Sequence, residues 1–123
     1  MEEEVVRLSE AMDWFLTTKR VNGRAEKTIE QYEYVINRFG QYLGRDPNIR
    51  SISPNKIRGL LGELVQDDYS KSTVAIFYRV LQAFFNWVEK EGLISDSPMD
   101  IIEKPKTPPS SFQEFLRKKK SRN

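Results

Sequence analysis

The sequence predicts an all-α protein: a compact orthogonal four-helix bundle with a short fifth helix and a proline- and lysine-rich carboxyl-terminal linker. Apolar side chains recur at steps of three and four in four successive segments, which is the spacing of one helix face. No segment alternates apolar and polar residues as a half-buried strand would. Glycine, proline and serine separate the segments, and 123 residues are enough for one domain with a core.

The first two helices are expected at about Glu3 to Lys19 and Glu26 to Leu43. The apolar face of the first consists of Val5, Leu8, Met12 and Phe15. The stripe of the second consists of Ile29, Tyr32, Ile36, Phe39 and Leu43. Gly23 suits the tight turn between the two helices, and Gly44 is a typical helix stop.

The third helix should open at Ser53-Pro54, with serine as the N-cap and proline in the first turn. Its buried face should consist of Ile57, Leu60, Leu61, Leu64 and Val65. Gly59 and Gly62 weaken this helix and suggest close packing against a neighbour. The fourth helix is expected from about Ser70 to Gly92, with Val74, Phe77, Leu81, Phe84 and Val88 on its core face. A short helical turn should follow Ser97-Pro98, and residues 104–109 read as an extended, stiff linker.

Composition argues against several classes of function. The chain contains neither cysteine nor histidine, which removes disulfides, the commonest zinc ligands and the commonest general base. We therefore expect no catalytic residue, no metal and no cofactor. Apolar stretches are too short to span a membrane, and Glu2 to Glu4 do not resemble a signal peptide. We expect a soluble, cytoplasmic protein with no membrane partner and no small-molecule substrate.

The faces opposite the apolar stripes of the second and fourth helices are rich in cations and amides. On the second helix this face consists of Lys27, Gln31, Tyr34 and Arg38, and on the fourth of Lys71, Ala75, Arg79, Gln82 and Asn86. Phosphates bind cations and hydroxyls, whereas base edges bind arginine, asparagine and glutamine. Such faces are usually only solvated, so the pattern indicates nucleic-acid binding without establishing it. Trp14 and Trp87 are most simply core or rim residues.

The order of local motifs resembles the amino-terminal core-binding domain of tyrosine recombinases, which include Xer-type recombinases and phage integrases. The second helix begins Ala25-Glu26-Lys27-Thr28-Ile29 and reaches Tyr32, as the family's helix does. The fourth begins Ser70-Lys71-Ser72-Thr73 and runs into Phe84-Phe85-Asn86-Trp87. Ser97-Pro98 and Lys104-Pro105-Lys106 resemble the family's turn and linker. Ala25 and Ser97 depart from the usual serine and asparagine.

The resemblance implies a SAM-like core-binding domain at residues 1–103 and, at 104–123, a linker with the start of an absent catalytic domain. It implies binding to double-stranded DNA that a recombinase's catalytic half then cuts and exchanges, and contact with neighbouring protomers. The expected DNA-binding residues are Lys27, Thr28, Gln31, Arg38, Lys71, Ser72, Thr73, Arg79, Lys104 and Lys106. Of these, Gln31 and Arg79 are the candidates for base edges, and Lys27, Thr28, Lys71 and Ser72 for the backbone.

Two other hypotheses remain beside DNA binding. A helical protein-interaction module could share this architecture and have lost contact with DNA, because a fold does not determine a function. Acidic residues such as Glu26 and Glu30 would then dominate the polar surface of the second helix. A complete enzyme is disfavoured because the chain has too few groups for acid–base chemistry.

Overall fold

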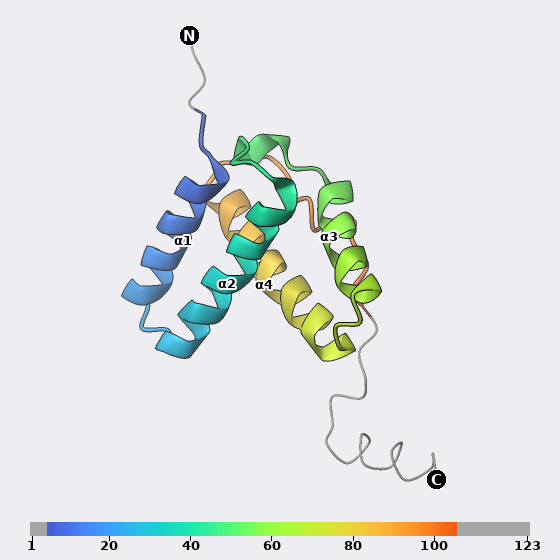
Figure 1. The fold of residues 1–123 in the computed structure, drawn as a ribbon. Coiled ribbons are helices and arrows are strands. Elements are labelled where there is room, and N and C mark those ends of the chain that lie inside the picture. The colour runs from blue at the N-terminus through green and yellow to red at the C-terminus, as the bar shows by residue number, and fades with distance from the viewer. Residues whose placement is uncertain (1–4, 106–123) are drawn as a thin grey trace, which may run out of the picture.

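The computed structural model describes residues 5–105, which form four α-helices and no strand. The helices are α1 (Leu8–Val21), α2 (Glu26–Leu43), α3 (Pro54–Gln66) and α4 (Lys71–Lys90), with a short 3₁₀ helix at Ile49–Ser51 between α2 and α3. In Figure 1, α1 and α2 form one antiparallel hairpin, α3 and α4 form a second, and α4 crosses behind α2. The predicted all-α class and four main helices are confirmed.

The start of α1 differs from the prediction, because the helix begins at Leu8 and not near Glu3. The preceding residues are extended and pair with the segment after α2: the Ile49 N–H donates to the Val6 carbonyl at 2.7 Å. The carboxylate of Asp46 then accepts the Ser9 N–H at 2.9 Å and its hydroxyl at 2.6 Å. A loop distant in sequence thus caps α1, and Val5 is 50% exposed outside the predicted core stripe.

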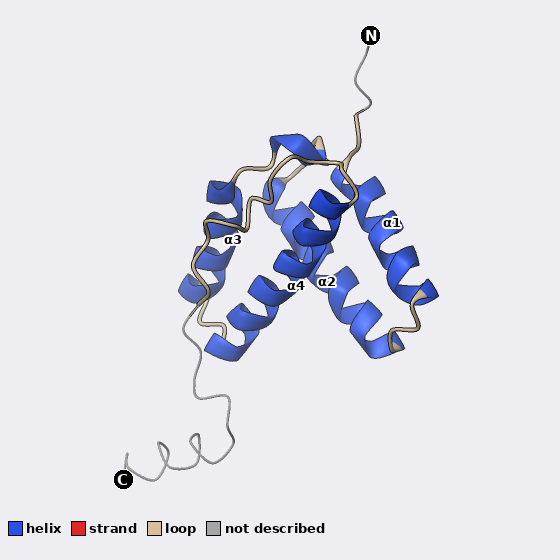
Figure 2. Cartoon of the chain, turned by 180° about the vertical axis from the view of Figure 1, so that it is seen from behind, coloured by secondary structure: helices blue, strands red, loops and turns tan. Residues whose placement is uncertain are grey.

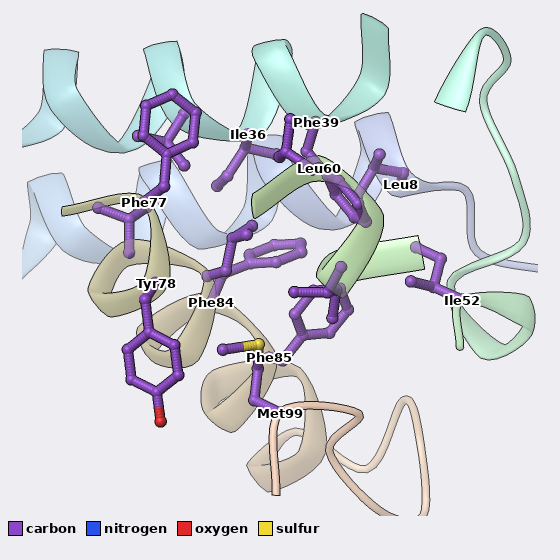
Figure 3. Packing of buried hydrophobic residues seen from close by; sticks show 14 of the residues in the cluster. Leu8, Ile36, Phe39, Ile52, Leu60, Phe77, Tyr78, Phe84, Phe85 and Met99 are labelled. Carbon is purple, nitrogen blue, oxygen red and sulfur yellow. The ribbon is translucent and has the colours of Figure 1, made fainter. Parts of the chain in front are cut away.

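The core lies where the two hairpins cross. Phe84 and Phe85 of α4 are fully buried, and their rings pack edge-on with centroids 5.0 Å apart. Phe84 also contacts Phe15 of α1 at 5.3 Å, and Phe85 contacts Phe39 of α2 at 6.3 Å. Figure 3 shows the Phe84 and Phe85 rings inside the cluster, to which all four helices contribute buried side chains. Two adjacent aromatic residues of α4 therefore join the hairpins.

Most of the predicted core residues are buried, with exceptions at the edges of the stripes. Ile36, Phe39, Phe77, Leu81 and Phe84 are buried as expected. Tyr32 and Leu43 are only partly buried at the edge of the core. Val65 is 61% exposed, so its assignment to the buried face of α3 was wrong. Leu64 is fully buried, and the next side chain projects about 100° further around the helix, toward solvent.

Close packing at a glycine of α3 is confirmed at one of the two predicted positions. A Cβ on Gly59 would collide with the Tyr42 ring of α2, where it would lie 3.0 Å from Cζ. Nothing lies within 4 Å of the equivalent position on Gly62. Gly59 thus lets α2 approach α3, whereas Gly62 faces open space.

The segment after α4 folds back over the bundle as a strap, defined here as residues 93–105. The predicted fifth helix is absent, because residues 98–101 form hydrogen-bonded turns. Ser97 is buried and its Oγ accepts the Met99 N–H at 3.1 Å, while the Tyr78 hydroxyl donates to the Ile102 carbonyl at 3.3 Å. Figure 2 shows the strap running along α3 toward the loop between α3 and α4. Lys106 and the rest of the linker lie outside the described residues.

Candidate nucleic-acid interface

The starts of α2 and α4 lie at the same end of the molecule, at the tips of the two diverging hairpins (Figures 1 and 2). The turn 22–25 forms the α1–α2 tip, and the loop 67–70 forms the α3–α4 tip. Each helix start carries free backbone N–H groups and the positive end of a helix dipole, so this end of the molecule has two such starts. Lys27, Lys71 and Ser72, predicted to contact phosphate, are all exposed in these first turns, and Thr28 is half-buried.

Charge is sorted into two strips along α2. Glu26, Glu30, Glu33 and Asn37 share one strip, which continues to Gly40 beside Leu8 of α1. Lys27, Gln31, Tyr34 and Arg38 share the other strip, at the same steps of four, three and four. The acidic strip therefore borders α1, and the basic and amide strip lies on the side away from it.

The basic strip of α2 borders the first half of α4 and the end of α3. The Tyr34 ring contacts Phe77 of α4, with ring centroids 6.1 Å apart. Thr73 lies one turn before Phe77, on the same side of α4. We call the surface formed by Lys27, Gln31, Tyr34, Arg38 and Thr73 the α2–α4 groove; Phe77, which contacts Tyr34, is buried. Four of the predicted DNA-binding residues lie on this surface.

Arg38 is tied to α3 instead of projecting freely into the α2–α4 groove. Its Nη2 donates to Oε2 of Glu63 at 3.0 Å, and the two side chains are 20% and 41% exposed. The hydrogen bond and the charge of Glu63 raise the pKa of the guanidinium, partly offset by burial. Because the carboxylate occupies part of its donor fork, Arg38 is a weaker phosphate ligand than its position on the strip suggests.

Arg79 lies on a different side of α4 from the α2–α4 groove. It follows Phe77 by two residues, and such residues project about 200° apart on a helix. Its side chain is exposed, and α4 carries no carboxylate before Glu89. Gln31 and Arg79, the two candidates for base edges, therefore do not share one continuous strip.

The two helix starts differ in how their N–H groups are satisfied. The Ser70 Oγ accepts the Thr73 N–H at 3.1 Å and donates to the Thr73 hydroxyl at 3.0 Å. Ala25 has no side-chain acceptor, so α2 begins without a side-chain cap. Thr73 thus stabilises the start of α4, and the first N–H groups of α2 remain open to a ligand.

Sequence reasoning missed Tyr69 at this end and gave no functional role to the loop pair Asp67-Asp68. Tyr69 is 41% exposed. Tyr69 and Tyr34 both lie close enough to Arg38 to raise the pKa of its guanidinium. Asp67 and Asp68 place two exposed carboxylates on the α3–α4 tip. Helical periodicity could not place Tyr69 or the two carboxylates, because they lie in a loop. The strap runs to the same tip (Figures 1 and 2), and its Lys104 is exposed.

The two tryptophans lie on the rim of the bundle, as expected from the sequence. Trp87 is half-buried and packs edge-on against Phe15, with ring centroids 5.6 Å apart. Trp14 is 47% exposed on α1.

Within the described residues, no helix has the length and apolar character needed to cross a membrane.

The helical fold and the basic end define a domain of the kind found in DNA recombinases. A model of the phage integrase N-terminal SAM-like domain matches residues 12–94, so the chain belongs to this family. Tyrosine recombinase XerD of Listeria monocytogenes is 31% identical over 97 residues, which cover 75% of this chain and 31% of the relative. The chain thus spans about a third of the length of the recombinases that it matches.

Solved integrases have the same fold. The integrase of mycobacterium phage Brujita superposes with a TM-score of 0.72 at 25% identity, over 81% of this chain and 33% of that one. Lambda integrase, solved as a dimer bound to a COC′ core site, superposes with a TM-score of 0.75 over 93% of this chain and 33% of that one. At 18% identity, the second likeness shows the fold alone.

Proposed function

We propose that this domain binds double-stranded DNA as the core-binding part of a tyrosine recombinase. It would position the duplex for strand exchange by a catalytic domain, and it would contribute no reacting group. The observation that carries the proposal is the sorting of charge on α2, which gives the α2–α4 groove cations and amides and leaves the carboxylates beside α1. Family membership supports the same function.

The residues divide by the part of DNA that they suit. Lys27 and Thr28 lie beside the open N–H groups of α2, where the helix dipole also favours a phosphate. Gln31 lies one turn further along the same strip, and its amide can pair with an adenine edge. Lys71 and Ser72 would hold the backbone at the second tip. Arg79 stays a candidate for a base only if the duplex also reaches the outer side of α4.

The protein-interaction hypothesis is less well supported. It required Glu26 and Glu30 to dominate the polar surface of α2, and both are exposed. They lie on the strip next to α1, however, and so leave the groove without a carboxylate of its own, apart from the Glu63 that pairs with Arg38. Contact with neighbouring recombinase protomers remains compatible with DNA binding.

A fluorescence-anisotropy titration of the protein with a labelled random duplex tests the proposal. We expect weak binding at low salt, with a log–log salt slope of about −0.9 per phosphate contacted. Lys27→Gln should weaken binding and flatten the slope by about one contact. Lys56→Gln, at the exposed start of α3 on the opposite end, is the matched control and should change nothing. Absence of binding at low salt would refute the proposed function.

A further inference from the structure

Three cations gather beside the contact between α1 and α4. Lys19 is near the end of α1, and its Nζ lies 5.4 Å from the centroid of the Phe15 ring. That ring packs against Trp87, and Lys90 follows Trp87 by three residues at the end of α4. The Arg24 N–H donates to the Lys19 carbonyl at 3.1 Å, which holds the turn against α1. We call Lys19, Arg24 and Lys90 the basic cluster.

Glu26, Glu89 and Glu91 lie next to the basic cluster in sequence, but none of the three forms an ion pair with it. Within residues 5–105, none of its three side chains forms an ion pair or a hydrogen bond with an acidic residue. The pKa of Lys19 lies below its ordinary value because burial removes water from the ammonium and because Arg24 and Lys90 repel its charge. Holding like charges together opposes folding, so the arrangement is one that a bound anion would relieve.

We propose that the basic cluster binds phosphates of the DNA backbone, as a second contact beyond the α2–α4 groove. This inference rests on the proposed function, because it names a further part of the surface that meets the same duplex. Arg24 precedes Lys27 by three residues, so the α1–α2 tip carries cations on both sides of the start of α2. The cluster extends the cationic surface around this tip and onto α1 and α4.

The basic cluster would contact the DNA backbone, and these contacts carry no sequence preference. Lysine acts on phosphate as a point charge, and the cluster contains no amide side chain that could read a base edge. Lys19 is fixed over an aromatic ring, so less conformational freedom is lost when a phosphate binds there. An acidic segment, such as residues 2–4 of a second copy of the chain, is the rival occupant.

Charge-removing variants of similar size test the proposal: Lys19→Gln, Arg24→Gln and Lys90→Gln, alone and combined. Duplex binding is measured by anisotropy between low and moderate salt, with Lys27→Gln as the positive control and Lys56→Gln as the negative control. Each single change should flatten the log–log salt slope by about 0.9, and the combined variant by about three times as much. The melting temperature of Arg24→Gln and Lys90→Gln should stay unchanged or rise, because repulsion is removed. Weaker binding together with undiminished stability excludes misfolding as the cause.

Three results would overturn the inference in distinguishable ways. If the cluster variants bind DNA with the parent's slope while Lys27→Gln is weakened, the cluster is not a DNA contact and the proposed function stands. If the parent does not bind DNA at all, the proposed function fails first. If DNA binding is unchanged but sedimentation shows concentration-dependent self-association that the combined variant loses, the occupant is the acidic segment of a second copy.

Discussion

The α1–α2 tip and the α3–α4 tip have similar architecture and different chemistry. Each joins two antiparallel helices and starts a long helix at the same end of the molecule. The α1–α2 tip carries Lys19, Arg24 and Lys27, together with the carboxylate of Glu26, around an uncapped helix start. The α3–α4 tip carries Asp67 and Asp68, and the Ser70 hydroxyl already occupies the Thr73 N–H. Two helix starts with similar sequence patterns therefore differ in how well they can bind an anion.

The difference suggests a division of roles between the tips. If the proposed function holds, the open N–H groups and the excess of cations should make the α1–α2 tip the stronger phosphate site. At the α3–α4 tip the Ser70 cap stabilises the start of α4, and the two carboxylates should repel phosphate. The following predictions test this comparison, from the largest expected effect to the smallest.

Removing the Phe84 ring, which packs between the two hairpins, should have the largest effect on stability. Phe84→Ala should lower the free energy of unfolding by about 3–5 kcal/mol, because a fully buried ring that contacts both Phe15 and Phe85 is lost. Val65→Ala, at a position 61% exposed, should change it by less than about 0.5 kcal/mol. Urea unfolding followed by circular dichroism measures both. Equal stability of the two variants would show that the core was misassigned.

The two glycines of α3 should respond to alanine with opposite signs. Gly59→Ala places a Cβ against the Tyr42 ring and should destabilise by about 1–2 kcal/mol as α3 is pushed from α2. Gly62→Ala meets no neighbour and should stabilise by about 0.5–1 kcal/mol through helix propensity. Thermal unfolding of both variants decides the matter. A stabilised Gly59→Ala would mean that the two hairpins are not in close contact there.

The unequal caps predict opposite responses at the two tips. Ser70→Ala should destabilise by about 1 kcal/mol because the Thr73 N–H loses its acceptor. Ala25→Asp should stabilise by roughly 1 kcal/mol, since it supplies α2 with a cap and a favourable charge. It should also weaken DNA binding through repulsion of phosphate.

A matched cap at the far end controls for the aspartate itself. Ser53→Asp adds the same charge at the start of α3, which also lacks a side-chain cap bond. It should stabilise the fold by a similar amount and leave DNA affinity nearly unchanged. Equal weakening of DNA binding by both aspartates would indicate a general charge effect and not a site at the α1–α2 tip.

The smallest effect is expected at the pair between Arg38 and Glu63. A double-mutant cycle with Arg38→Gln and Glu63→Gln should give a coupling energy below about 1 kcal/mol, because the carboxylate is 41% exposed. Glu63→Gln should also strengthen DNA binding, since it frees the guanidinium in the α2–α4 groove. Anisotropy at low salt measures that gain, and Glu33→Gln serves as a control that removes an exposed carboxylate from the acidic strip of α2. Weaker binding by Glu63→Gln would show that the ion pair holds the groove in shape.

Much of the fold could be predicted from the sequence because long apolar stripes determine which helix faces meet. Errors arose where a partner distant in sequence decides the outcome. The start of α1 depends on Asp46, 37 residues after Ser9. The turns at 98–101 replace a helix because the strap is held by Tyr78 of α4. Periodicity describes one helix at a time and contains no information on such contacts.

The candidate site was less predictable than the fold, for the same reason. Periodicity placed Lys27, Gln31 and Arg38 on one strip, but it could not show that Glu63 engages the arginine. The basic cluster is drawn from residues 19, 24 and 90, so only the packing of α1 against α4 brings it together. Similar motifs at the starts of α2 and α4 also concealed the difference between their caps.

An NMR titration of the ¹⁵N-labelled protein with duplex DNA at low salt tests the central claim most directly. The claim is that DNA meets the end formed by the two tips, and meets the α1–α2 tip more strongly. The largest amide shifts should then fall on residues 19–31 and 71–73, with smaller shifts at Lys90 and the largest salt sensitivity near Arg24 and Lys27. Shifts confined to the acidic strip beside α1 or to the start of α3, or no shifts at all, would contradict the account.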